Sequence, residues 1–253
     1  MWRIEPSPLG RIAVPPVVPE GFAVFCTTLD FDGKLTGDVA TTISDAIRER
    51  FGIESTLNTC TQVHGARLAH AVSVDAWREC DSCDALWSDV THVALGIKVA
   101  DCLPVTMVDS AHGVIANIHS GWRGAIQQIT ARSVNILTHD SAFDPPSAYA
   151  YLGPSIRACC FEVGEEVAEM FREEHIDRSV GDRRSRLSGQ AGLPVPHKPH
   201  VDLVAFTIDS LRERGFADER IFDSGLCTRC DGSVFHSFRR DGKGGRNLAI
   251  VAH

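Results

Sequence analysis

Three short segments of the sequence each place a histidine or a cysteine just after an apolar stretch that is typical of a β-strand. These residues are His64, Cys102 and His119, in the segments Thr61–Gly65, Ala100–Pro104 and Asn117–Gly124. Functional side chains concentrate on such loops because the preceding strands form a rigid scaffold. Two imidazoles and one thiolate are the ligands of a catalytic zinc site that keeps its fourth position open. Magnesium and calcium prefer oxygen ligands, so a metal held by these residues would be zinc, with copper as the alternative. From residue types alone, each histidine could instead be a structural hydrogen-bonding residue and Cys102 a small buried hydrophobe.

Other polar residues near these segments could take part in the chemistry. Arg123 lies between two glycines where a strand is expected to turn into a helix. A helix N-terminus attracts anions and an arginine can grip phosphate through two hydrogen bonds, although Arg123 could equally cap the turn. Asp84 and Asp101 could orient a ligand imidazole or relay protons, or could instead stabilise turns. We predict catalytic roles for all three, beside Cys102 and His119.

The same residues allow other functions. Cys102 could act as a nucleophile with His119 or His64 as its base, which would make the protein a cysteine hydrolase. A metal-bound thiolate would not be free to attack, so metal content separates the two hypotheses. Copper-dependent phenol oxidation ranks lowest, because a multicopper oxidase needs more paired histidines than this chain offers. A metal-stabilised binding module would need a fourth ligand, and none is evident beside the three.

The nine cysteines do not form the pattern of a secreted protein. Their number is odd and their spacing irregular, which argues against a framework of disulfides. Two pairs are separated by two residues, Cys80/Cys83 and Cys227/Cys230. These pairs could form a four-cysteine zinc site only if the fold brings them together. The adjacent Cys159–Cys160 is expected to pack in the core.

Length and composition favour one globular domain over residues 1–253. The chain is 43% hydrophobic and carries a formal net charge of −8, which argues against nucleic acid as its main partner. No apolar run approaches the ~18 residues that a membrane span needs, so no membrane association is expected. The segment Met1–Pro19 lacks the features of a signal peptide, and we expect a cytoplasmic protein. The oligomeric state is not predicted.

Apolar periodicity predicts strands and helices that come in groups and do not alternate strictly. Strands are expected at Phe22–Thr27, Leu57–Val63, Arg67–Val72, Val93–Val99, Pro104–Val108, Val114–Ile118, Ala148–Leu152 and Arg246–Val251. Helices are expected at Asp38–Phe51, from Gly124 to about Leu137, around Val163–Phe171, and after Asp202 as far as Gly215. The proline-rich N-terminus suggests extended edge structure, and Arg178–Pro199 suggests an exposed, mobile loop near the mouth of the site. This pattern favours an α+β fold, with mixed sheets at the centre and helices outside.

Several motifs resemble the laccase-domain family, first described as multicopper polyphenol oxidases. They are TQVHG, ADCLPV, HSGWRGA, GPSIRACCFEVG, CT followed by C two positions later, and FRRDG-x2-GR, in the order of the family from about Asn58 to Ala252. The resemblance implies a cysteine-hydrolase-like fold and a metal bound by His64, Cys102 and His119. The chain departs from the family at Thr27–Gly33, where the usual arginine and paired glycines are absent. The Asn-Arg pair often found in the first helix is also absent near Thr41–Ala46.

The resemblance also implies an activity. The family is associated with phosphorolysis of adenosine, inosine, guanosine and methylthioadenosine, and with adenosine deamination. The expected partners are therefore a nucleoside and phosphate, with Arg123 holding the phosphate. Arg239 and Arg240 could form a second anion site or a solvated turn. Bacterial members have also been tied to editing of peptidoglycan precursors, which corresponds to the hydrolase alternative.

Overall fold

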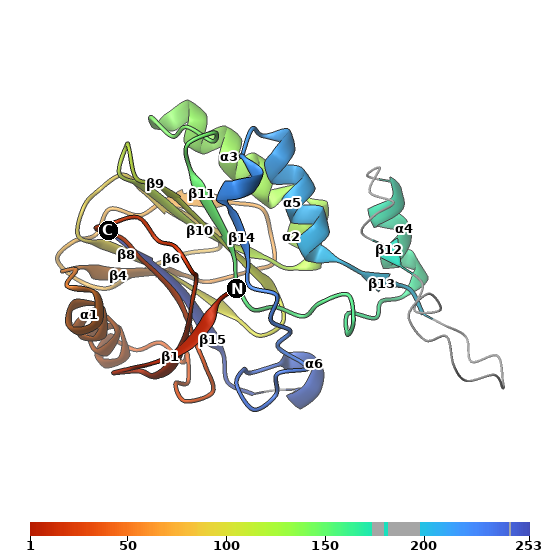
Figure 1. The fold of residues 1–253 in the computed structure, drawn as a ribbon, viewed down its shortest axis with the longest axis horizontal. Coiled ribbons are helices and arrows are strands. Elements are labelled where there is room, and N and C mark those ends of the chain that lie inside the picture. The colour runs from red at the N-terminus through yellow and green to blue at the C-terminus, as the bar shows by residue number, and fades with distance from the viewer. Residues whose placement is uncertain (174–179, 182–197, 243) are drawn as a thin grey trace.

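The computed structural model describes residues 1–173, 180–181, 198–242 and 244–253. Two mixed β-sheets form its centre and pack face to face (Figure 1). The first sheet has the strand order β1-β2-β3-β15-β8-β4-β6, and the second has the order β14-β11-β9-β10-β7-β5. A short pair, β12 and β13, lies apart from both sheets. The predicted α+β fold with central mixed sheets is confirmed.

The strands of the first sheet are β1 (Arg3–Ser7), β2 (Gly10–Val14), β3 (Ala23–Thr27), β4 (Thr56–Cys60), β6 (Arg78–Cys80), β8 (Val93–Val99) and β15 (Asn247–Ala252). Those of the second sheet are β5 (Leu68–His70), β7 (Ala85–Ser88), β9 (Leu103–Asp109), β10 (Val114–Ser120), β11 (Tyr149–Leu152) and β14 (Ile221–Asp223). The short pair consists of β12 (Val180–Gly181) and β13 (His200–Val201). The α-helices are α1 (Gly37–Phe51), α2 (Trp122–Ile126), α3 (Ile129–Asp140), α4 (Glu165–Glu173), α5 (Leu203–Glu213) and α6 (Phe238–Asp241).

The two sheets and the helices form four layers. Successive side chains of a strand point to opposite faces, so each sheet buries both of its faces. Leu95 of β8 and Ile115 of β10 belong to the core between the sheets. The outer face of the first sheet packs against α1, and that of the second packs against α2, α3 and α5 (Figure 1). Both sheets are therefore sandwiched, which explains why the strands β3, β7, β9, β10 and β15 are buried along their whole length.

Helix α1 shows how local sequence defines an element. The Thr36 side chain accepts a hydrogen bond from the Val39 amide, and Gly52 ends the helix in a left-handed conformation with φ 71°. Ile43 and Ile47 lie one turn apart and are fully buried against the first sheet. The prediction of a helix over Asp38–Phe51 is confirmed to within one residue.

The single helix predicted from Gly124 to about Leu137 is wrong. The structure has two helices there, α2 and α3, separated by Gln127 and Gln128, and Gln128 has a left-handed φ of 61°. A left-handed residue cannot continue a right-handed helix, so the chain changes direction at this point. Nothing in the local sequence marks the break, because glutamine is a good helix former.

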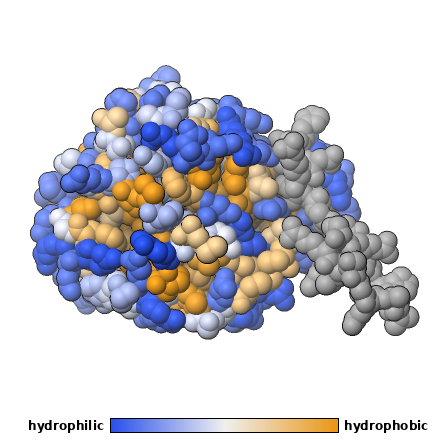
Figure 2. Space-filling model, viewed as in Figure 1, coloured by the Kyte–Doolittle hydropathy of each residue, from blue (hydrophilic) through white to orange (hydrophobic). Residues whose placement is uncertain are grey.

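Most of the predicted loop Arg178–Pro199 lies outside the described residues. Its described part includes Val180–Gly181, which pairs with β13. The N-terminal prediction of extended edge structure is confirmed by β1, which lies at the edge of its sheet. No helix in the described ranges is long and apolar enough to cross a membrane. Figure 2 shows hydrophobic side chains across the middle of the viewed face and hydrophilic ones around its rim.

Candidate metal centre

The fold brings together the three residues that the sequence singled out as metal ligands. His64 follows β4, Cys102 lies in the turn between β8 and β9, and His119 is near the end of β10. In the β9–β10 pairing, His119 lies opposite Pro104, which places it beside the turn that carries Cys102. Potential donor atoms of the three side chains lie within 4.8 Å of one another. The two imidazole rings meet edge to face, with centroids 4.8 Å apart.

The carboxylate of Asp84 fixes the positions of His64 and His119 through hydrogen bonds. Its side chain is fully buried, and it accepts hydrogen bonds from the amides of Val63, His64 and Gly65 at 3.2, 2.9 and 2.7 Å. It also lies 2.8 Å from Nδ1 of His119. With Nδ1 donating to the carboxylate, Nε2 is left as the nitrogen that can ligate a metal. The prediction that β4 extends to Val63 is wrong, because these amides turn towards Asp84 and the strand ends at Cys60.

Room for the group depends on a glycine. A Cβ atom at Gly121 would lie 2.9 Å from Sγ of Cys102 and 3.2 Å from Cδ2 of His64. Both distances are shorter than ordinary van der Waals contacts, so any side chain at this position would displace the thiol or the imidazole. His64 itself has a left-handed φ of 59°, a strained conformation that Asp84 supports through its hydrogen bond to the His64 amide.

The charges of the group depend on its hydrogen bonds. Burial alone would raise the pKa of the Cys102 thiol, but hydrogen bonds from His119 and His64 outweigh burial and bring it to about 6. Burial alone would lower the pKa of His119, but hydrogen bonds to Asp84 and Cys102 raise it to about 9. Burial also opposes ionisation of Asp84, yet the bonds from His119 and Gly65 hold its pKa below the ordinary value. The metal-free group therefore favours a thiolate, which is the form that binds metals and attacks electrophiles.

A cavity of about 630 Å³ opens in front of the three residues. Its apolar wall is formed by Trp122, Ile156, Phe161, Leu203 and Phe238. Its cationic side chains are Lys98, Arg123, Arg239 and Arg246. An apolar pocket with a few convergent charges is the usual form of a small-molecule site, and these charges favour an anionic ligand.

Of the three predicted catalytic residues that are not ligands, Arg123 and Asp101 border the cavity, whereas Asp84 lies behind the ligands. Arg123 lines the cavity and stacks on Trp122, with Cζ 4.4 Å from the ring centroid. Asp101, with a positive φ of 87°, also borders the cavity. Its carboxylate accepts hydrogen bonds from the Thr228 hydroxyl and the Arg239 amide, both at 2.6 Å. Asp84 bonds to the imidazole of His119, whereas Asp101 bonds to residues of the cavity wall and fixes their positions.

Arg239 and Arg240, the possible second anion site, have different surroundings. Arg239 lines the cavity. Arg240 bonds to Asp241 and to the carbonyls of Thr228 and Phe235, so it stabilises a turn. In the atypical Thr27–Gly33 segment, Asp30 forms an ion pair with Arg11 of β2 at 2.7 Å, which is a structural contact.

One expectation about cysteines is wrong, and one possibility left open by the sequence is not realised. Cys159 is exposed and Cys160 is only half-buried, so the pair does not pack in the core. Cys227 and Cys230 lie beside this pair and not beside Cys80 and Cys83. The physical reason is that the pairing of β11 with β14 places the loops that follow these two strands next to each other.

Several residues of the cavity were not singled out from the sequence, although each lies within one of the motifs that carry the family resemblance. Gln62 exchanges two hydrogen bonds with the Lys98 backbone, at 2.7 and 2.9 Å, and so joins the His64 loop to β8. Phe161, in the loop after β11, and Phe238, the first residue of α6, reach the cavity from segments distant in sequence. The motifs could have drawn attention to these residues, but an isolated phenylalanine looks like an ordinary core residue, so only the fold reveals that they line the cavity.

Comparison with known proteins assigns the class. The family model described as "Multi-copper polyphenol oxidoreductase laccase" matches residues 34–253, and the chain belongs to this family. The chain is 31% identical over 245 residues to adenosine deaminase RL5 from an unknown prokaryotic organism, a match that covers 88% of this chain and 90% of that protein. It is 34% identical over 192 residues to a purine nucleoside phosphorylase of Deinococcus radiodurans, covering 75% and 67% of the two chains.

Solved structures share the fold. The Bacillus licheniformis hypothetical protein YfiH superposes with a TM-score of 0.80 at 21% identity, over 99% of this chain and 98% of that one. YlmD from Geobacillus stearothermophilus superposes with a TM-score of 0.76 at 24% identity, over 96% of both chains. The sandwich of two mixed sheets is therefore the fold of these laccase-domain proteins.

Proposed function

We propose that this protein is a metal-dependent enzyme of purine nucleosides, which catalyses their phosphorolysis and the deamination of adenosine. The observation that carries the proposal is the convergence of His64, Cys102 and His119 at the wall of one cavity with apolar and cationic sides. The names of the relatives, a purine nucleoside phosphorylase and an adenosine deaminase, support the substrate class.

The three residues suit a zinc or copper ion. They offer two imidazole nitrogens and one sulfur, Asp84 orients one imidazole from behind, and Gly121 leaves space beside the sulfur. In the described part of the chain no fourth His, Cys, Asp or Glu joins the group. Such a site is open to substrate, as a catalytic site must be. When bound, the ion would supply Lewis acidity at the end of the cavity.

The remaining residues account for binding. The apolar wall, which includes Phe161 and Phe238, offers a surface for the flat face of a purine. The cationic side chains offer partners for phosphate, and the Arg123 guanidinium has no hydrogen-bond acceptor among the described residues. An arginine in this state can form two parallel hydrogen bonds to an anion. Arg123 thus holds phosphate for attack on the anomeric carbon of the ribose.

A nucleoside panel with and without phosphate tests this function. Phosphorolysis of adenosine, inosine, guanosine or methylthioadenosine releases the free base and ribose 1-phosphate or its methylthio analogue, and requires phosphate. Deamination of adenosine releases ammonia and does not require phosphate. Metal removal should abolish both activities, and zinc or copper should restore them. Metal-loaded protein that releases neither a base nor ammonia from any of these nucleosides would refute the proposal.

One observation favours a second candidate, a cysteine hydrolase. Asp84, His119 and Cys102 form a chain of carboxylate, imidazole and thiol, the arrangement in which a cysteine acts as a nucleophile. Cys102→Ser separates the candidates. A metalloenzyme loses metal and activity together, since a hydroxyl is a poor soft ligand. A hydrolase, whose substrates would include peptidoglycan precursors, loses activity with its metal content unchanged.

A further inference from the structure

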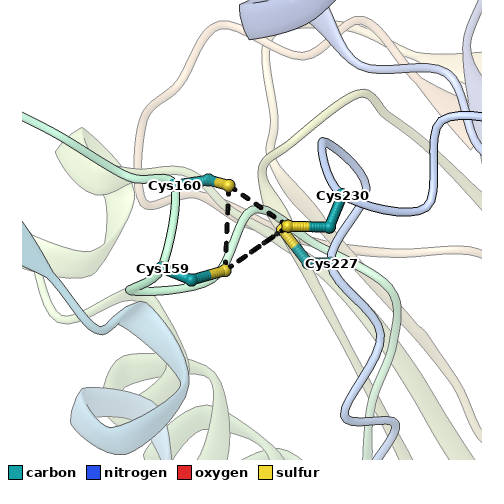
Figure 3. Close-up of side chains that lie close together, drawn as sticks. All are labelled: Cys159, Cys160, Cys227 and Cys230. Atoms are coloured by element: carbon teal, nitrogen blue, oxygen red, sulfur yellow. Dashed lines mark hydrogen bonds between the residues drawn. The ribbon is translucent and has the colours of Figure 1, made fainter. Parts of the chain in front are cut away.

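Four cysteines form a second cluster, separate from the candidate metal centre. Cys159 and Cys160 belong to the loop after β11, and Cys227 and Cys230 belong to the loop after β14. The four sulfurs lie within 4.8 Å of one another. Figure 3 shows that all four side chains point towards a common centre.

The main chain brings these loops together, so the cluster does not depend on side chains alone. β11 and β14 pair in parallel, and an isolated bridge between Ser155 and Cys227 continues the pairing beyond the strands. The Thr228 amide donates to the Ser155 carbonyl at 3.0 Å, and the Cys227 amide donates to the Asp231 carboxylate at 3.0 Å. The Cys160 amide donates to the Arg157 carbonyl at 2.8 Å, so the backbone is hydrogen-bonded at both pairs of cysteines.

The separations between the sulfurs are close to those around a tetrahedral ion, apart from a shorter distance between Cys160 and Cys230. Sγ of Cys159 lies 3.7 Å from the sulfurs of Cys160, Cys227 and Cys230, and Cys160 lies 3.3 Å from Cys230. Four sulfurs at ~2.3 Å from a zinc ion in a tetrahedron lie ~3.8 Å from one another. All four cysteines are free, and these distances are far longer than the ~2.05 Å of a disulfide.

The second pair lies in one tight turn. The Asp231 amide donates a hydrogen bond to the Cys227 carbonyl at 2.8 Å, so the backbone between Cys227 and Asp231 is closed on itself. Two cysteines separated by two residues in such a turn have the spacing that is usual for a pair of zinc ligands.

From this geometry we propose that Cys159, Cys160, Cys227 and Cys230 bind one zinc ion in a closed, structural site. Four thiolates satisfy the tetrahedral preference of zinc and leave no position for substrate. The ion ties together two loops that build the wall of the cavity. One contains the lining residues Ile156 and Phe161, and the other contains Thr228, whose hydroxyl bonds to Asp101. Its role is to hold that wall in place.

Zinc content of the full-length protein, reconstituted under reducing conditions, tests the site. Cys230→Ser should remove one equivalent of zinc per chain relative to the unaltered protein, whatever the first centre holds. Cys230 is exposed, so its replacement should be tolerated by the fold. Cys80→Ser is the matched control, since Cys80 belongs to neither cluster, and it should leave the zinc content unchanged. Repeating the comparison in a Cys102→Ser background removes the contribution of the first centre.

Two measurements without variants at the cluster give independent readouts. X-ray absorption of zinc-loaded Cys102→Ser should show a zinc coordinated by four sulfurs. Alkylation followed by mass spectrometry should show that zinc protects Cys159, Cys160, Cys227 and Cys230 together. Equal zinc content in Cys230→Ser and the unaltered protein would overturn the proposal. It would also be overturned by alkylation of the four thiols at the same rate with and without zinc, or by a Cys160–Cys230 disulfide in reduced, zinc-supplied protein.

Discussion

Asp84→Asn tests the role of the buried carboxylate most directly. Asp84 accepts from four donors: the amides of Val63, His64 and Gly65, and Nδ1 of His119. An amide of the same shape keeps one oxygen and replaces the other with an NH2 group, which accepts nothing. In either orientation, two of the four donors therefore lose their acceptor.

The size of the effect follows from these bonds. A buried donor without an acceptor costs about 1–3 kcal/mol, so two of them lower the free energy of unfolding by about 2–6 kcal/mol. If the NH2 group faces His119, the imidazole must carry its proton on Nε2, and that nitrogen can no longer ligate a metal. Loss of such an orienting carboxylate weakens metal binding or activity by about 10–100-fold.

A matched control separates ligand orientation from loss of stability. Asp109 is also fully buried and accepts from the amides of Ala111, His112 and Asp144 and from Nδ1 of His112. It lies at the far end of β9 from Cys102. Asp109→Asn should therefore destabilise the fold to a similar degree, yet retain metal affinity and activity. Urea unfolding and competitive zinc titration of both variants give the two quantities. Equal zinc affinity in the two variants would refute the reasoning.

Three further results are expected. Gly121→Ala should weaken metal binding by at least ~10-fold in the same titration, because its Cβ would lie 2.9 Å from Sγ of Cys102; unchanged affinity would contradict this. Arg123→Ala should lower phosphorolysis by about 10–100-fold and deamination much less, because only phosphorolysis needs phosphate. Equal losses of phosphorolysis and deamination, or the same loss of phosphorolysis in the exposed control Arg132→Ala, would show that Arg123 does not hold phosphate. In metal-free protein, alkylation of Cys102 should rise with pH through a midpoint near 6, because hydrogen bonds from two histidines outweigh the burial that raises its pKa. A midpoint near 9.0, the ordinary value, would show that these bonds do not form.

Periodic apolar segments were predictable from the sequence because burial is a local requirement. The strand predicted at Val93–Val99 has those bounds in the structure, and the helix predicted at Asp38–Phe51 begins one residue earlier. Asp202 caps helix α5 by accepting from the amides of Val204 and Ala205, as its position before the apolar stripe suggests. Where a break depends on one residue in a rare conformation, as at Gln128, periodicity carries no information about it.

The sequence by itself determined which residues could form the candidate metal centre. His64, Cys102 and His119 are recognisable because each follows or ends an apolar segment, because their donor types suit zinc or copper, and above all because they lie in motifs that resemble the laccase-domain family. Only the tertiary structure decided which partners they have. Asp84 lies far from His119 in the chain, yet β7 pairs with β10 and sets the carboxylate against the imidazole. In the same way, the β11–β14 pairing joins Cys227 and Cys230 to Cys159 and Cys160 instead of Cys80 and Cys83. Donor chemistry is a property of single residues, whereas strand order and register arise from packing of the whole chain, and no local pattern records them.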